Sequence, residues 1–254
     1  KDRNYVTIVS PKILGIKSNK KSFFREIPDE SSINNFDFDY IDLFNPNRLS
    51  GNDRFDSSTR IDYGLSFLKK KISNDQDITL IEIGQSFQLD KNKYLQKNSG
   101  INDKLSDIVI NLRLKPQKNI KLNSYLKINK DNSSIKTAHS EFLMHQKNSY
   151  LSVSNIRSAP VLDVTGENVK EGINQFSFRY NQKLFDHWNF TSFTTFDKKS
   201  KIKMHNFGAK LKYEDECFGL SFVWTRQFTH NPEDPTSNNF AFLFSIKEVM
   251  ESDL

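Results

Sequence analysis

The sequence predicts an all-β protein: an antiparallel transmembrane β-barrel portion of about twelve strands, which alone would form an open curved sheet. Three observations support this prediction. Twelve segments alternate apolar and polar residues over about ten positions each, and this period of two sorts side chains onto opposite faces of a strand. Tilted strands of about 9–11 residues are long enough to cross a bilayer. Most connectors on one side are long and those on the other are short, as in outer-membrane barrels.

The first predicted strand is Tyr5–Ser10, which ends at Pro11. A long irregular region rich in Asn, Asp and Ser follows it, at Gly15–Ser58. Loops of this length are usually functional or disordered, and we expect this one to be a long extracellular loop.

Eleven further strands are predicted in close succession, each from the same alternation. Asn174–Leu184 shows it best, because Phe176, Phe178 and Tyr180 point one way while Ser177 and Arg179 point the other. The strands are Thr59–Lys70, Ile78–Leu89, Asp107–Lys115, Ile120–Lys130, Ile135–His145, Tyr150–Arg157, Asn174–Leu184, Trp188–Asp197, Lys203–Tyr213, Cys217–Phe228 and Phe240–Lys247.

The connectors between these strands fall into two sets if the strands run up and down. The short set is Lys71–Asp77, Pro116–Asn119, Gln146–Ser149, Phe185–His187 and Glu214–Glu216. The other set is the opening loop, Asp90–Ser106, Ser158–Ile173 and Thr229–Asn239, with Asp131–Ser134 and Lys198–Ile202 as short exceptions. Short turns are periplasmic in outer-membrane barrels, so we expect Glu214–Glu216 and the C-terminus on the periplasmic side.

Composition excludes some classes of protein. No run among the 254 residues approaches the 18 or more apolar residues of a transmembrane helix, so a helical membrane protein is excluded. The formal charge is +6 with both signs interspersed, and no basic stripe or motif indicates nucleic-acid binding. The chain starts at Lys1 without a signal peptide, and we expect a mature product or a fragment.

No catalytic or cofactor-binding constellation stands out, so the sequence predicts neither an enzyme nor a cofactor. The five His residues are scattered without ligand spacing, and GxSxG, P-loop and GxGxxG motifs are missing. Asp37, Asp39 and Asp42 offer oxygen ligands of the kind that Ca²⁺ prefers, but they lie in a polar stretch where a solvated loop is the simpler interpretation.

The same alternation also fits a soluble β protein whose apolar face turns inward. Two details favour the membrane. Most of the predicted strands are longer than the usual five or six residues. Large aromatics such as Trp188, Tyr213 and Trp224 lie near strand ends, where interfacial girdles sit.

The stretch Asp42–Phe67 is the most specific part of the chain. Its Asn-Pro-Asn and Ser-Gly-Asn triplets are turn signals. Arg48 and Arg54 offer forked donors to Asp53 or to other carboxylates of the loop. We therefore expect a folded loop, pinned by ion pairs, that leads into an alternating strand.

Cys217 is the single cysteine of the chain. A lone Cys is usually a small buried hydrophobe, whereas an odd Cys in an exported protein suggests a bonding partner outside the chain. Its predicted position beside a periplasmic turn would expose the thiol to an oxidising compartment.

Two blocks of sequence resemble a known family. Leu43-Phe44, Asn47–Arg54, Thr59-Arg60 and Tyr63–Leu65 are similar to the hallmark loop and strand of the LPS-assembly protein family LptD. Tyr213–Cys217, Gly219–Phe222 and Trp224–Phe228 resemble the penultimate-strand region of that family, and Phe240–Lys247 resembles its closing strand. The loop residues that carry the first match are Asn47, Arg48, Gly51, Asp53 and Arg54.

The resemblance implies a fold and a set of partners. The whole of residues 1–254 would be the C-terminal part of an outer-membrane barrel, with a jelly-roll domain and the barrel's first half outside it. Lipopolysaccharide would be the cargo in a Gram-negative outer membrane, an LptE-like lipoprotein would plug the lumen, and an LptA-like bridge would reach the N-terminal domain. Lipopolysaccharide would leave through a lateral seam between the first and last strands. Cys217 matches a position that forms a disulfide in the family, with Phe218 where some members have a second cysteine.

Strand alternation then assigns faces. The lipid-facing set includes Ile120, Leu122, Leu126, Ile128, Phe176, Phe178, Phe218, Leu220 and Phe222. The basic residues on the opposite, lumen-facing side are Arg113, Lys115, Lys121, Lys127, Arg179, Lys210 and Lys212, which either contact a plug or sugar phosphates or only solvate the lumen. On the closing strand at the seam, Phe240, Phe242, Phe244 and Ile246 would face lipid.

Two other functions remain open from the sequence. One is a general porin-like outer-membrane barrel, which would have a solute pore and no lipoprotein plug. The other is a soluble β-sandwich module that binds a lipid or a carbohydrate. Solubility without detergent would favour the sandwich, and co-purification with a lipoprotein would favour the translocon over the porin.

Overall fold

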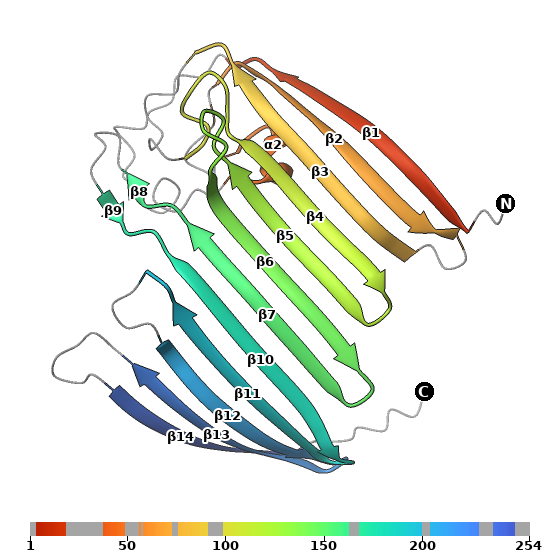
Figure 1. Ribbon diagram of the computed structural model, residues 1–254, viewed down its shortest axis with the longest axis vertical. Helices are drawn as coiled ribbons and strands as arrows, with labels where there is room; N and C mark the ends of the chain where they lie inside the picture. Colours follow the sequence, from red (N-terminus) through yellow and green to blue (C-terminus); the bar gives the residue numbers. More distant parts are fainter. Residues whose placement is uncertain are drawn as a thin grey trace. The chain divides into compact units, whose positions relative to one another are not determined.

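A computed structural model of the chain describes residues 4–18, 38–48, 56, 58–72, 76–90, 99–162, 168–199, 204–228 and 236–246. Twelve strands form one sheet, joined in the order β1-β2-β3-β4-β5-β6-β7-β10-β11-β12-β13-β14 (Figure 1). The strands are β1 (Tyr5–Ile16), β2 (Arg60–Lys71), β3 (Gln76–Gln88), β4 (Ile108–Gln117), β5 (Ile120–Ile128), β6 (Ile135–Gln146), β7 (Ser149–Ser158), β10 (Asn174–Phe185), β11 (Trp188–Asp197), β12 (Met204–Glu214), β13 (Phe218–Phe228) and β14 (Thr236–Ile246).

The predicted fold class is confirmed. Each of the twelve predicted strands has its counterpart, and every neighbouring pair with a determined register is antiparallel. The order is linear, so that β1 and β14 are the two ends of an open sheet. This topology follows from short connectors, because consecutive strands joined by a tight turn pair with each other.

Several predicted boundaries are wrong: β14, for example, begins at Thr236 rather than at Phe240. The largest error concerns the first strand. The first strand does not end at Pro11 but continues to Ile16, and Pro11 lies opposite Leu65 in the register. β1 is at one end of the strand order and pairs with β2 alone. Within the described sheet, the N–H that Pro11 lacks has no second strand to serve. Gly15, placed in the long loop by the sequence pattern, is therefore part of this strand.

Two predicted connectors contain secondary structure of their own. The short helix α2 (Tyr40–Leu43) lies within the predicted opening loop, and β8 (Val161–Leu162) pairs with β9 (Asn168–Lys170) inside the connector that follows β7. Neither segment shows the long periodicity on which sequence interpretation depends. No helix in the described part of the chain is long and apolar enough to cross a membrane.

The chain divides into two compact units. Unit 1 comprises residues 1–140 and 156–173, and unit 2 comprises residues 141–155 and 174–254. In unit 1 the register places Gly64 opposite Gly84 and Asp62 opposite Ser86, and these residues share a face with Ser66 and Glu82. We call this the polar face of unit 1. Its opposite, the apolar face of unit 1, carries Ile61, Tyr63, Leu65, Phe67, Ile81 and Ile83.

Unit 2 has the same two-sided character. Ser177 lies opposite Thr195, and Thr191 lies opposite Lys210, on what we call the polar face of unit 2. The apolar face carries aromatic pairs, such as Phe176 with Phe196, whose ring centroids are 5.5 Å apart. The remaining aromatic pairs on that face include Trp188 with Tyr213 and Phe207 with Trp224.

The apolar faces of both units stay exposed. Leu65 is 44% exposed in unit 1, and Phe222 is 47% exposed in unit 2, although both are large apolar residues. A soluble sandwich would cover these faces with a second layer. A single layer with an exposed apolar face requires an apolar medium or partner to cover it.

Candidate functional site

The candidate site lies on the polar face of unit 1, where the segment after β1 folds back against the sheet. Among the described residues of this segment lies α2, which begins after the N-cap residue Asp39. The Asp39 carboxylate accepts hydrogen bonds from the backbone N–H groups of Ile41 and Asp42 at 2.7 and 2.8 Å. The Asp42 carboxylate accepts in return from the Asp39 N–H at 3.3 Å, which completes a capping box. The two carboxylates considered as Ca²⁺ ligands therefore start a helix, and Asp37 lies outside the described residues.

Helix α2 is held by a small apolar core. Phe38, Tyr40 and Leu43 are buried against Ile101 and Val109. The hydroxyl of Tyr125 on β5 donates to the backbone carbonyl of Phe38. Burial of each large apolar side chain stabilises this docking by about 1.5–3 kcal/mol.

Two glycines make room for this core. Gly64 and Gly84 face each other across β2 and β3, and their missing side chains leave space for the helix. A Cβ on Gly84 would lie 2.3 Å from Cδ2 of Leu43, and one on Gly64 would lie 3.1 Å from Cε2 of Tyr40. The glycine pair is thus a seat for α2, because any side chain there would collide with the helix.

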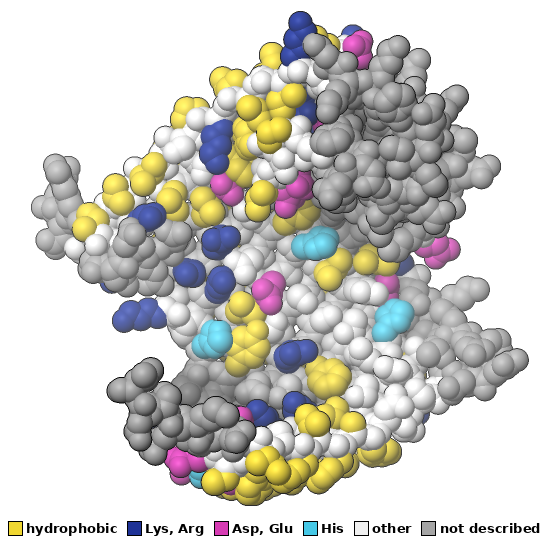
Figure 2. Space-filling model, turned by 180° about the vertical axis from the view of Figure 1, so that it is seen from behind, with side chains coloured by type: hydrophobic (Ala, Val, Ile, Leu, Met, Phe, Trp, Pro, Cys, Tyr) yellow, Lys and Arg dark blue, Asp and Glu magenta, His cyan; other side chains and the backbone are white. Residues whose placement is uncertain are grey.

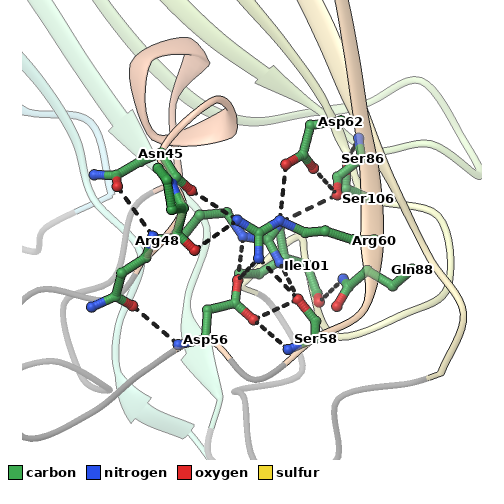
Figure 3. Close-up of polar contacts among 12 residues, drawn as sticks. Asn45, Arg48, Asp56, Ser58, Arg60, Asp62, Ser86, Gln88, Ile101 and Ser106 are labelled. Carbon is green, nitrogen blue, oxygen red and sulfur yellow. Dashed lines mark hydrogen bonds and ion pairs between the residues drawn. The ribbon is translucent and has the colours of Figure 1, made fainter. Parts of the chain in front are cut away.

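Past α2, a buried ionic network joins the chain to β2. Arg48 Nε lies 2.5 Å from Asp56 Oδ2, and Arg60 Nη1 lies 2.9 Å from the same oxygen (Figure 3). Arg60 Nε lies 2.9 Å from Asp62 Oδ2, and Ser86 Oγ donates to Asp62 Oδ1 at 2.5 Å. Arg60 is only 1% exposed. A charge buried this deeply is stable only when it is paired and hydrogen-bonded, so the guanidinium depends on these acceptors.

The backbone of the loop is tied into the same network. Arg60 Nη2 donates to the carbonyl oxygens of Asn45 and Pro46 at 2.8 and 3.2 Å. Asn47 Oδ1 accepts from the N–H of Asp56 at 3.0 Å. Since these contacts use all sides of one planar guanidinium, Arg60 fixes the position of the turn at Asn45–Asn47.

Burial and charge act against each other at the centre of the network. Burial raises the pKa of Asp56, but the neighbouring Arg48 and Arg60 guanidinium groups outweigh it and hold that pKa below its ordinary value. Burial lowers the pKa of Arg48, against the opposing effect of Asp56. Asp56 is therefore a charged carboxylate at neutral pH, compensated by two cations.

The expected ion-paired loop is present, with partners that the sequence pattern did not identify. Asn47 and Arg48 take part as described above, whereas Gly51, Asp53 and Arg54 lie outside the described residues. The sequence pattern did not identify the centre of the ion-paired network, which consists of Asp56, Arg60 and Asp62. The alternation in β2 did contain a signal, because Arg60 and Asp62 occupy consecutive positions on the polar face.

A second anchor holds the described residues that lead into β4, from residue 99 to residue 107. The buried Asp107 accepts from the N–H of Lys130 at 3.2 Å and lies 2.7 Å from Lys136 Nζ. Its own N–H donates to the carbonyl of Gly100 at 2.7 Å, and Gly100 has a φ of +85°, which favours glycine. This anchor presents Ile101 to the core beneath α2.

The predicted basic residues lie on the polar faces. In unit 1, Arg113 lies opposite Leu80 and Asn123, and Lys127 lies opposite Val109; Lys115 and Lys121 share that face by strand alternation. In unit 2, Arg179 lies opposite Phe193, while Lys210 and Lys212 lie opposite Thr191 and Asn189. Lys127 is only 3% exposed, so it is covered rather than presented to solvent. Figure 2 shows Lys, Arg and His side chains at the surface, seen from behind the view of Figure 1.

The closing strand and the cysteine are also placed. Phe240, Phe242, Phe244 and Ile246 share one face of β14, in register with β13. Their exposed fractions are 68%, 68%, 54% and 78%. Cys217 lies in the turn before β13 rather than in the strand, and it is free and exposed. Its N–H and that of Phe218 both donate to Asp215 Oδ1 at 2.8 Å.

These arrangements suit binding and support rather than bond-making chemistry. Among the described residues, no group of three or more His, Cys, Asp or Glu side chains is placed to hold a metal ion. In the Arg48–Asp56–Arg60–Asp62 network, all four charges are paired with one another. The network therefore serves to hold a loop on the polar face.

A family model described as LptD: LPS transport system D matches residues 22–188, about two thirds of the chain. The chain belongs to the LptD family. The match contains α2, the network and its glycine seat, so the resemblance read from Asp42–Phe67 is confirmed. The LptD match ends before β12, so the resemblance of the Cys217 region and of β14 stays a prediction. LptD is a transport family rather than an enzyme family. A search of curated proteins found no match.

The network predicts a dependence of stability on pH. Because the pKa of Asp56 is lowered by folding, its contribution is present in full above the ordinary carboxyl pKa and is lost as the pH falls through the folded-state value. We expect the urea midpoint of the full-length protein to fall between about pH 5 and pH 3. The Asp56→Asn variant should be less stable at pH 7 but should show a shallower fall. Equal slopes for both proteins would contradict the role given to Asp56.

Proposed function

We propose that this chain forms part of the wall of the outer-membrane translocon that assembles lipopolysaccharide into the outer leaflet of a Gram-negative bacterium. The observation that carries the proposal is the LptD match over residues 22–188, described as an LPS transport component. The geometry supports it, because each unit has one apolar and one polar face. The cargo has the same two-sided chemistry, with acyl chains and an anionic saccharide.

The strand lengths support membrane insertion. The twelve strands of the main sheet have from nine residues, in β5, to thirteen, in β3. At about 3.3 Å per residue and a tilt of about 45°, such strands cross a hydrocarbon layer. Burial of the exposed apolar faces in lipid then drives insertion at about 25 cal/mol per Å².

The polar faces would line the lumen through which the saccharide moves. An LptE-like lipoprotein would plug that lumen, and the segment from the end of β1 to residue 58 would form an extracellular loop of the barrel. Support comes from the docking of α2 on the polar face of unit 1, which shows that this face accepts a folded segment. An LptA-like periplasmic bridge would deliver lipopolysaccharide to an N-terminal domain of the protein.

The closing strand would form one side of the lateral exit. β14 pairs with β13 on one side and is the last strand in the order. Its apolar face, with Phe240 and Ile246 at the two ends, would contact lipid where the cargo leaves. A disulfide engineered between β14 and the first barrel strand should block export, and reduction should restore it. Continued export with the strands locked would reject the lateral exit.

The proposed function is tested by depletion and complementation. Cells depleted of the full-length protein should lose surface lipopolysaccharide, measured by modification in the outer leaflet, and the wild-type gene should restore it. Stable surface lipopolysaccharide during depletion would reject the proposal. Co-purification with a lipoprotein would distinguish the translocon from a porin-like barrel.

Cys217 provides a further test of the family assignment in the part of the chain beyond the match. Its exposed thiol lies in a turn that we place in the periplasm, where thiols are oxidised. We expect the full-length protein to migrate differently with and without reductant, and Cys217→Ser to remove the part of that difference due to this bond. A thiol at Cys217 that reacts fully with a maleimide in native membranes would contradict the expected disulfide.

A further inference from the structure

A hollow of about 430 Å³ lies on the polar face of unit 2. Its wall is built from consecutive neighbours in the sheet, with Ser152 and Ser154 on β7, Ser177 on β10 and Thr195 on β11. Ser177 Oγ and Thr195 Oγ1 lie 3.1 Å apart in a cross-strand hydrogen bond. Pockets of about 300–1,000 Å³ with a few convergent polar groups are the usual size of small-molecule sites.

Arg179 supplies a positive charge at this hollow. It lies opposite Phe193 in the register, and its side chain is exposed. The described residues offer it no hydrogen-bond or ion-pair partner, unlike the fully paired Arg48 and Arg60 of unit 1. A guanidinium left open in this way matches the oxygens of a phosphate, which it binds with two parallel hydrogen bonds.

Phe193 and Asn206 complete the wall. A Cβ on Gly208 would lie 2.5 Å from Cζ of Phe193, so the glycine lets this ring lie across β12 beside the hollow. Aromatic rings offer apolar area to the faces of sugar rings. Asn206 also lines the hollow, and its Oδ1 is buried without a hydrogen-bond partner within the described residues.

The one carboxylate of the wall stands apart from the cation. Glu141 belongs to β6, whereas Arg179 belongs to β10, with β7 between them. Neighbouring strands are about 4.8 Å apart, so the two side chains begin at least about 10 Å from each other. At that separation a ligand can place its anionic group at Arg179 and donate a hydroxyl proton to Glu141.

We propose that this hollow is a binding subsite for a phosphorylated saccharide, with Arg179 holding the phosphate and the serine and threonine hydroxyls meeting the sugar. The inference rests on the proposed function, which brings a phosphorylated saccharide along this face. The inference adds to that function the place where the saccharide binds and the side chain that recognises its charge. A plain anion site would need no hydroxyl wall, and a neutral sugar site would need no open guanidinium.

The test measures affinities of the full-length protein in detergent for three probes: an N-acetylglucosamine disaccharide, the same disaccharide carrying a phosphate, and inorganic phosphate. We expect the phosphorylated disaccharide to bind about tenfold or more tightly than either other probe. Arg179→Gln should bring its affinity to that of the neutral sugar. Lys183→Gln is the matched control, because Lys183 lies on the same face of β10 as Arg179 without lining the hollow, and it should keep the preference.

Two results would overturn the subsite. Inorganic phosphate that binds as tightly as the phosphorylated disaccharide would show a simple anion site. An unchanged preference in a folded Arg179→Gln protein, judged by its heat-modifiable gel mobility, would show that the phosphate lies elsewhere. Surface lipopolysaccharide restored by the wild-type gene tests the proposed function separately, so that failure of the subsite and failure of that function are distinguishable.

Discussion

Replacement of Arg60 by methionine is expected to cost about 3–5 kcal/mol of unfolding free energy. The change leaves Asp62 with only a hydroxyl donor from Ser86 and leaves Asp56 with Ser58 and a single cation, Arg48. It also releases the carbonyl of Asn45. Urea unfolding of the full-length protein at pH 7 measures the loss.

Two variants bracket this effect. Arg60→Lys keeps the charge but cannot reach Asp56, Asp62 and the Asn45 carbonyl at once, so we expect an intermediate loss. Arg113→Met removes an exposed arginine from the same polar face and should change the free energy by less than about 0.5 kcal/mol. Equal effects of Arg60→Met and Arg113→Met would show that the buried network does not hold the fold.

The strands were predictable because each one carries its own information. A period of two over about ten residues identifies a strand, and a short connector pairs it with its neighbour. Strand alternation could not predict the core contacts of Val109, because Phe38 and Ile101 come from loops that are distant in the sequence. Pro11 was misjudged because a proline usually marks the end of a strand, whereas the pairing of β1 with β2 continues through it to Ile16.

The candidate site was predictable only in outline. Turn signals and arginines predicted an ion-paired loop around Arg48. Which carboxylate pairs with Arg48 depends on which side chains are buried together, and a local sequence pattern does not show this. Asp56 was not favoured over Asp53 by spacing alone. The sequence also could not predict the role of the two glycines beneath α2. A Gly in a strand indicates that another part of the chain comes close, but it does not identify that part.

Gly84→Ala is the second substitution with a large expected effect, about 1–3 kcal/mol of destabilisation. The new methyl group would lie 2.3 Å from Cδ2 of Leu43 and 3.1 Å from the carbonyl oxygen of Tyr63. Leu43 is fully buried in the core beneath α2, so it has little room to move. We expect the helix to lift from the polar face, with faster proteolysis of the segment around α2.

A double-mutant cycle separates this collision from a general strain on the strand. Leu43→Ala alone should cost about 2–5 kcal/mol through the cavity it leaves. The pair Gly84→Ala with Leu43→Ala should cost less than the sum of the single changes, because the methyl group then occupies space that the leucine vacated. Gly15→Ala on β1 is the control, since nothing lies within 4 Å of its Cβ position, and it should be neutral or slightly stabilising. Additive effects at Gly84 and Leu43 would mean that the glycine seat does not position α2, and the polar face would then hold its loop through the Arg60 network alone.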